Sequence, residues 1–301
     1  MTILVAAGFD ADEWRDWWPL LQTALPGERL VRERVAGDAA EIDIALVANP
    51  PFGALRELPG LKLIQSLWAG VDRLLSDASV PIGVPVARMV DPAMNQSMAE
   101  TALWAVLGLQ RRFFAYATQQ RAGEWKQHAL QRAEETSIAV LGLGQMGRAV
   151  VQLLEHHGYR VDGWSTRDGE AALPRLLSSA GIVINLMPLT PATQGFFNAA
   201  TFARMRSGAA LVNLARGGHV VDADLLAALE SGQVAHAVLD AFHTEPLPPS
   251  HTFWSHPRVT VLPHVAAPTD PRSAALIAAA NVEALRAGRP LAHLVDRARG
   301  Y

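Results

Sequence analysis

Three ionisable side chains in the second half of the chain each follow an apolar run typical of a buried strand. Arg216 follows residues 209–214, Glu245 follows residues 235–239, and His264 follows residues 258–262. In an open sheet of parallel strands, ligands bind outside the carboxyl ends of the strands. We therefore expect the three side chains to face one crevice.

The three groups have complementary chemistry. Reduction of a 2-oxo acid by hydride requires an anchor for the carboxylate, polarisation of the carbonyl and a proton donor. The guanidinium fork of Arg216 suits the first two tasks. His264 suits the third because its usual pKa lies near neutrality, and a carboxylate such as Glu245 would orient the imidazole and raise its pKa.

Each residue also has an ordinary structural interpretation. A single histidine is more often structural, an arginine after a strand is more often solvated or ion-paired, and a glutamate before proline is usually a loop residue. The combination gains weight from a glycine motif, Gly-Leu-Gly-Gln-Met-Gly, at residues 142–147.

The glycine motif lies between a predicted strand at residues 137–141 and a helical pattern over residues 148–157. In a dinucleotide site, Gly142 would permit the turn, Gly144 would let the pyrophosphate approach the backbone, and Gly147 would pack the helix on the strand. Backbone N–H groups of the motif, including those of Gln145 and Met146, would face the phosphates at the positive end of the helix dipole.

Strand-like runs alternate with helical stretches along the whole chain, which predicts an α/β fold with doubly wound parallel sheets. The first half offers residues 2–7, 43–47, 62–66 and 84–87, and the second half offers residues 137–141, 159–164, 181–186, 209–214, 235–239 and 258–262. The second set has the strand count of a complete Rossmann sheet.

Two Rossmann-like or flavodoxin-like domains are predicted, with the cofactor and substrate cleft between them. A long helix over residues 95–121 would lead into the nucleotide domain, and a helix over residues 272–287 would cross back to the first domain. The substrate-binding domain would then comprise residues 1–97 and 268–301, and the dinucleotide-binding domain residues 98–267.

Composition excludes several other classes. The chain has 301 residues, 18% of them charged, a net charge of −3 and no cysteine. These values argue against general attraction to nucleic acid or acidic membranes and rule out disulfides and thiolate metal sites. Without a signal peptide or a membrane-length apolar run, we expect a cytoplasmic protein. The His, Asp and Glu residues do not occur in the sequence with the spacing of metal ligands, so we expect no metal site.

The segment after the second nucleotide-domain strand bears on the choice of nicotinamide cofactor. In NAD sites an acidic residue about 20 positions after the glycines binds the ribose 2′-OH. Ser165 stands near that position, followed by Thr166 and Arg167, which favours the 2′-phosphate of NADP(H), with NAD(H) still possible. An ordinary polar turn is the alternative, and the nearby Asp168 would weaken the effect.

The chain resembles the D-isomer-specific 2-hydroxyacid dehydrogenase family over nearly its whole length, and within it the glyoxylate/hydroxypyruvate reductase A branch. The matching stretches are the glycine turn and residues 69–72, 213–222, 240–249, 253–258 and 263–267. The resemblance implies reduction of small 2-oxo acids such as glyoxylate or hydroxypyruvate, and a homodimer packed through the nucleotide domains.

The resemblance also implies roles for individual residues. Arg216 would bind substrate, Glu245 would partner the histidine, and His264 would be the acid/base. Backbone N–H groups of Ala69 and Gly70 would receive the substrate carboxylate. Further cofactor contacts would come from Met187, Pro188, Thr190, Ala215, Asp240 and Gln145.

Two positions depart from the family pattern. Trp68 stands where glycine commonly precedes the substrate loop, and Ala48 stands where the glyoxylate reductase branch carries an aromatic residue. Both are expected to border the pocket, so a larger 2-oxo acid is an alternative substrate. Trp14, Trp17 and Trp18 have helical spacing and are expected to form a packing face.

Two other classes of function are weighed against this one. A non-catalytic dinucleotide sensor could use the same scaffold, although the complete trio argues against it. Formate dehydrogenases carry glutamine beside the histidine, so Glu245 argues against that activity.

Overall fold

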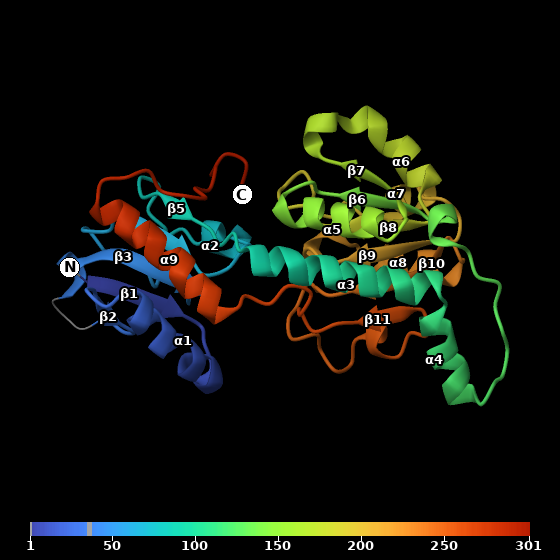
Figure 1. Cartoon of the computed structure of the whole chain (residues 1–301), viewed down its shortest axis with the longest axis horizontal. Coiled ribbons are helices and arrows are strands. Elements are labelled where there is room, and N and C mark those ends of the chain that lie inside the picture. Colours follow the sequence, from blue (N-terminus) through green and yellow to red (C-terminus); the bar gives the residue numbers. More distant parts are fainter. Residues whose placement is uncertain (1, 35–37) are drawn as a thin grey trace. The chain divides into compact units, whose positions relative to one another are not determined.

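The chain forms two compact units, each built on its own parallel β-sheet (Figure 1). The computed structural model describes residues 2–34 and 38–301. The first unit comprises Met1–Ala93 and Thr269–Tyr301, and the second comprises Met94–Pro268. The sequence placed the domain boundaries at 97/98 and 267/268, and the compact units divide at 93/94 and 268/269.

The first unit contains a five-stranded sheet in the order β2-β1-β3-β4-β5. Its elements are β1 (Thr2–Ala7), α1 (Ala11–Ala24), β2 (Arg29–Val31), β3 (Ile42–Ala48), β4 (Leu63–Ser66), α2 (Asp72–Ser76), β5 (Val86–Ala87) and α9 (Pro271–Arg286). The sequence predicted every strand except β2. That strand has only three residues and lies at the edge of the sheet, so it lacks the apolar run used for prediction.

Capping and ion pairing hold the helices of the first unit. Asp10 caps α1 by accepting hydrogen bonds from the backbone N–H groups of Asp12 and Glu13. At the end of α9, the Arg286 guanidinium contacts the carboxylates of Glu28 and Asp43. The C-terminal helix is thus tied to the N-terminal part of the chain, and α9 packs against α1.

The second unit contains a six-stranded parallel sheet in the order β11-β10-β9-β8-β6-β7. Its elements are α3 (Pro92–Gln110), α4 (Phe113–Ala122), β6 (Ser137–Leu141), α5 (Gln145–His156), β7 (Arg160–Trp164), α6 (Leu173–Ser179), β8 (Ile182–Asn185), α7 (Ala199–Arg204), β9 (Ala209–Asn213), α8 (Asp222–Glu230), β10 (Val234–Leu239) and β11 (Val259–Val261). All six strands were predicted from the sequence, with ends that differ by at most one residue.

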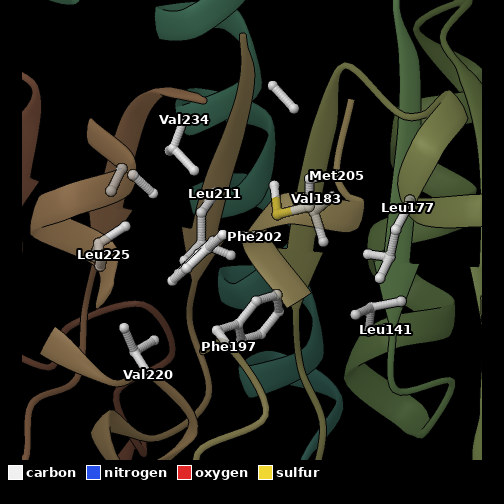
Figure 2. Packing of buried hydrophobic residues seen from close by; sticks show 14 of the residues in the cluster. Leu141, Leu177, Val183, Phe197, Phe202, Met205, Leu211, Val220, Leu225 and Val234 are labelled. Carbon is white, nitrogen blue, oxygen red and sulfur yellow. The ribbon is translucent and has the colours of Figure 1, made fainter. Parts of the chain in front are cut away.

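The central strands β6, β8 and β9 are buried on both faces, which explains why they read as nearly continuous apolar runs. Successive side chains alternate between the faces. Leu141, Val183 and Leu211 point toward α6, α7 and α8, where they pack with Phe197 and Phe202 (Figure 2). The intervening residues, including Val140 and Ile184, pack against α3 and α5 on the other face.

The predicted long helix over residues 95–121 is wrong in one respect, because the structure divides it into α3 and α4. The break lies at Arg111 and Arg112, where Arg112 adopts a left-handed conformation with φ of +61°. Neither glycine nor proline marks this position, so no local signal announces the break.

The order of the strands fixes where a ligand can bind. In the second sheet the first and third strands in sequence, β6 and β8, are neighbours, with β7 beyond β6. This arrangement makes a topological switch point between β6 and β8, outside whose carboxyl ends ligands bind in doubly wound sheets. The glycine turn follows β6 and the segment beginning at Leu186 follows β8.

Candidate active site

The glycine turn after β6 has the geometry of a dinucleotide cradle. Gly142 has φ of +105°, and a Cβ atom there would lie 2.5 Å from the carbonyl oxygen of Leu186. A Cβ atom at Gly147 would lie 1.9 Å from the carbonyl oxygen of Gly142, so the third glycine lets α5 pack closely on the turn. A Cβ atom at Gly144, by contrast, would find no atom within 4 Å beyond its immediate chain neighbours, so the space there is open.

The start of α5 adds hydrogen-bond donors to this open space. Gly144 is the N-cap, and α5 begins at Gln145 and Met146, whose backbone N–H groups precede the first intrahelical bonds. Helix N-termini favour phosphate through these N–H groups and the helix dipole. The open space above Gly144 and these donors therefore fit the pyrophosphate of a dinucleotide.

His264 and Glu245 form a direct pair. Nδ1 of His264 lies 2.7 Å from Oε2 of Glu245, and since a carboxylate only accepts, Nδ1 donates. The other carboxylate oxygen of Glu245 accepts from the backbone N–H of Phe242 at 2.9 Å. This fixes the tautomer and leaves Nε2 of a half-exposed imidazole to face a ligand.

The pair shifts the acidity of both partners. The hydrogen bond that His264 donates to Glu245 raises the pKa of His264 above its usual value, and this effect outweighs the burial that lowers it. Burial alone would raise the pKa of Glu245, but hydrogen bonds from His264 and Phe242 lower it overall. The imidazole is thus held in its protonated form to higher pH than a free histidine.

The turn that presents His264 is fixed by Asp240. His264 has φ of +56°, a conformation that costs about 1–3 kcal/mol for a residue other than glycine. The backbone carbonyl of Asp240 accepts from the N–H of His264 at 2.9 Å, and its carboxylate accepts from Val265 at 2.7 Å and Ala266 at 3.0 Å. Asp240 was predicted to contact the cofactor, and its buried carboxylate bonds the His264 turn.

Arg216 lies in the same part of the second unit. Its positive charge contributes to the lowered pKa of Glu245 and partly opposes the rise in the pKa of His264, so the guanidinium lies within electrostatic reach of the pair. One of its nitrogens donates to the carbonyl oxygen of Ala215 at 2.8 Å. A Cβ atom at the next residue, Gly217, would lie 2.0 Å from the backbone of Phe242, so the loops that carry Arg216 and Glu245 are in close contact.

The predicted cofactor residues after β8 and β9 lie around the same edge of the sheet. Met187 and Ala215 are buried, while Pro188 and Thr190 are partly exposed. The hydroxyl of Thr190 lies 3.1 Å from that of Thr193. These residues follow strands that neighbour the glycine turn, as the switch-point arrangement requires.

The segment proposed to select the cofactor contains a bond that the sequence did not reveal. Asp168 accepts hydrogen bonds from the backbone N–H of Ser165 at 2.7 Å and from its hydroxyl at 2.8 Å. These bonds lower the pKa of Asp168. Arg167 is exposed and makes no ion pair within the part of the chain that the structure describes.

The predicted substrate residues Trp68, Ala69 and Gly70 lie in the first unit, in the loop after β4. The Trp68 ring packs against Phe9 at 6.0 Å and Trp17 at 5.7 Å between ring centroids. Within residues 2–34 and 38–301, the backbone N–H groups of Ala69 and Gly70 donate no hydrogen bond.

The tryptophans of α1 and Ala48, which the sequence also singled out, lie in the first unit as well. The Arg32 guanidinium lies 4.5 Å from the Trp14 ring centroid and 4.3 Å from that of Trp18, as in cation–π contacts. Ala48 is buried at the end of β3. The tryptophans of α1 are therefore engaged in packing.

Sequence reasoning missed three buried polar residues near Arg216. They are Asn185, Asn213 and His219, all completely buried. Asn185 and Asn213 end neighbouring strands, and a polar residue at the end of an apolar run is a signal that could have identified them.

The described residues contain neither a cluster of metal ligands nor a helix that could span a membrane. No group of three or more His, Asp or Glu side chains there is arranged to hold a metal ion. Nor does any described helix combine the length and apolar character needed to cross a membrane.

Comparison with known proteins shows which family the chain is similar to. Residues 103–266 match the family model for the NAD binding domain of D-isomer specific 2-hydroxyacid dehydrogenases. The chain is 41% identical to glyoxylate/hydroxypyruvate reductase A of Serratia proteamaculans, over 97% of each protein. It is 38% identical to the Yersinia enterocolitica protein of the same name, over 96% of this chain and 97% of the relative.

Solved structures extend the similarity to the whole fold. A D-isomer specific 2-hydroxyacid dehydrogenase from Xanthobacter autotrophicus, in complex with NADPH and MES, has a TM-score of 0.92 at 38% identity, covering 100% of this chain and 99% of that one. The NADPH-dependent glyoxylate/hydroxypyruvate reductase of Sinorhizobium meliloti, with NADP and sulfate, has a TM-score of 0.92 at 31% identity and the same coverage. The chain belongs to the D-isomer specific 2-hydroxyacid dehydrogenase family.

Proposed function

We propose that this protein reduces small 2-oxo acids, such as glyoxylate or hydroxypyruvate, to 2-hydroxy acids with NADPH. The observation that carries the proposal is the His264–Glu245 pair beside Arg216, which supplies an oriented proton donor and a cation at the carboxyl ends of the strands. The two relatives named glyoxylate/hydroxypyruvate reductase A support the same substrate class.

Each member of the trio has a distinct task in this reaction. Bound NADPH would supply the hydride for the carbonyl carbon. Nε2 of His264 would donate its proton to the carbonyl oxygen as negative charge develops there, while Arg216 would stabilise that charge. Glu245 would keep the imidazole protonated and in one orientation, because its carboxylate holds Nδ1 at 2.7 Å.

The substrate carboxylate would be received by the backbone N–H groups of Ala69 and Gly70. These two consecutive donors have no acceptor within the described parts of the chain. Trp68 would provide a rigid wall beside them, since two ring contacts restrict its indole. We propose that this wall, with the small Ala48, sets the size of the accepted 2-oxo acid.

Selection of NADPH would depend on Ser165, Thr166 and Arg167. Arg167 is exposed and available to pair with a 2′-phosphate. The bond between Ser165 and Asp168 opposes this selection, because the hydroxyl would have to leave the carboxylate in order to donate to the phosphate. The structures from Xanthobacter autotrophicus and Sinorhizobium meliloti contain NADPH or NADP, which supports NADPH here.

We further propose a cytoplasmic homodimer formed through the second unit. Large apolar side chains are exposed on α3, on α4 and in the segment that follows them. They include Trp104, Leu107, Phe113 and Leu130, and Trp125 is 95% exposed. An apolar surface of this kind is typical of a protein interface. The molar mass in solution, measured by light scattering, tests this proposal.

The test of the function is a kinetic panel of 2-oxo acids of graded size with NADPH and NADH. Oxidation of NADPH with glyoxylate or hydroxypyruvate, and formation of the matching 2-hydroxy acid, are the expected results. Preference for a larger substrate would revise the proposed role of Trp68. Binding of NADPH without turnover of any 2-oxo acid would instead indicate a dinucleotide sensor.

A further inference from the structure

A buried polar network joins the loops that follow β8 and β9. Its side chains are Asn185, Asn213 and His219, each 0% exposed. Buried polar groups of this kind stabilise one arrangement strongly when all their bonds are made. These side chains are separate from the proposed catalytic residues Arg216, Glu245 and His264.

The two asparagines connect the start of one loop to the other. Asn185 accepts from the backbone N–H of Met187 at 3.1 Å and donates from Nδ2 to Oδ1 of Asn213 at 2.9 Å. Nδ2 of Asn213 then donates to the backbone carbonyl of Arg216 at 3.0 Å. The chain of bonds thus ends on the residue proposed to bind substrate.

His219 closes the network from the other side. Its Nδ1 lies 3.1 Å from the carbonyl oxygen of Arg216, and its Nε2 lies 3.2 Å from the carbonyl oxygen of Pro188. Carbonyl oxygens only accept, and a neutral imidazole carries a single N–H, so the ring donates to one of these oxygens and packs its other nitrogen against the second. One ring therefore spans the loop proposed to contact the cofactor and the loop that carries Arg216.

The backbone around His219 is held independently of its side chain. The N–H of Gly195 donates to Gly218 at 2.8 Å, that of Phe197 to His219 at 2.8 Å, and that of Val221 to Phe197 at 2.9 Å. These bonds would remain after replacement of the imidazole. The carbonyl of Arg216 would also keep its bonds from the backbone N–H of His219 at 3.3 Å and from Nδ2 of Asn213 at 3.0 Å, so the distinct contribution of the ring is its link from that carbonyl to the carbonyl of Pro188.

We propose that His219 is a positioning residue that couples binding of the dinucleotide to the placement of Arg216 for the 2-oxo acid. This inference rests on the proposed function. A dinucleotide that orders the Pro188 loop would, through the imidazole, also order the carbonyl of Arg216. The substrate would then bind an arginine that is already ordered, so less conformational entropy is lost on binding. This produces positive coupling between the two ligands.

The test is calorimetric titration with oxalate, a dianion that resembles a 2-oxo acid, in the presence and absence of NADPH. For the wild type we expect NADPH to tighten oxalate binding about ten-fold. His219→Phe keeps a planar aromatic ring and removes both nitrogens, so the coupling should fall below about two-fold. His219→Gln, whose amide has two N–H donors, should restore most of it.

Steady-state kinetics gives a second readout that a purely structural role would not change. For His219→Phe we expect the KM for glyoxylate to rise about ten-fold, while the Kd of NADPH changes less than about three-fold. His236→Phe is the matched control, because His236 bonds Thr260 on β11 at 2.9 Å and contacts neither loop. That variant should keep the wild-type coupling and KM.

The outcomes separate this inference from the proposed function. Coupling in His219→Phe equal to that of the wild type would overturn the inference while leaving the function intact. Should that variant not fold, hydrogen exchange of the wild type decides: NADPH alone should slow exchange of residues 216–220, and unchanged exchange overturns the inference. A wild type without turnover or NADPH binding would overturn both.

Discussion

The His264 turn and the segment after β7 hold their polar side chains in opposite ways. At the turn, Asp240 bonds Val265 and Ala266, and Glu245 bonds the imidazole, so each group has a fixed partner. After β7, Ser165 and Asp168 bond each other at the surface, and Arg167 is exposed.

This difference indicates which property each region controls. Preorganised groups supply stabilisation at the moment of reaction, so a change at the turn should reduce the rate of the chemical step. Arg167 makes no ion pair among the described residues and acts through a screened charge, so a change after β7 should alter cofactor affinity by modest factors. Substitutions in the two regions should therefore affect different kinetic constants.

The largest effect is expected for His264→Ala. Loss of the proton donor should lower kcat by about 10³-fold, a typical contribution of general acid catalysis. NADPH binding, measured by fluorescence titration, should remain within about two-fold of the wild type because the glycine turn is unchanged. A variant with near-normal kcat would remove His264 from the proposed chemistry.

Arg216→Ala is expected to come next. Removal of the guanidinium should lower kcat/KM for glyoxylate by about 10²- to 10³-fold, since both anchoring and charge stabilisation are lost. Arg216→Lys should recover little, because an ammonium group cannot reproduce the planar fork. Full activity in the lysine variant would show that charge alone is sufficient at this position.

A smaller effect is expected after β7, for Arg167→Ala. Loss of the pairing charge should weaken NADPH about ten-fold and leave NADH nearly unchanged. Parallel Kd measurements for the two cofactors test this, with Arg160→Ala on β7 as a control of equal charge change. Equal losses for both cofactors would contradict the 2′-phosphate assignment.

The smallest expected effect is that of Asp168→Asn. Removal of the carboxylate should release the Ser165 hydroxyl and reduce repulsion of the 2′-phosphate, so NADPH should bind about three-fold more tightly. The same titrations measure it. Weaker NADPH binding in this variant would show that Asp168 instead supports the site by holding the turn.

The sequence predicted the fold well because buried parallel strands carry strong local signals. Apolar runs located the buried strands β6, β8, β9 and β10, while the three-residue edge strand β2 was missed. The break at Arg112 depends on a left-handed residue without glycine, and no periodic pattern marks such a position.

For the candidate site, motifs predicted which residues follow the strands but not which atoms they bond. The pairing of His264 with Glu245 was expected, and the structure places them at 2.7 Å. The bond from Ser165 to Asp168 and the bridge made by His219 depend on side-chain rotamers and loop packing. These cannot be derived from spacing alone.

The pH dependence of kcat/KM for glyoxylate reduction, in the wild type and in Glu245→Gln, tests the central claim most directly. Because Glu245 raises the pKa of His264, the wild-type rate should be high while the imidazole is protonated and should fall as pH rises through that raised pKa. In Glu245→Gln the carboxylate charge is lost, so the fall should move to lower pH and the rate near neutrality should decrease. Superimposable profiles for the two proteins would contradict the assignment of this pair as the proton donor.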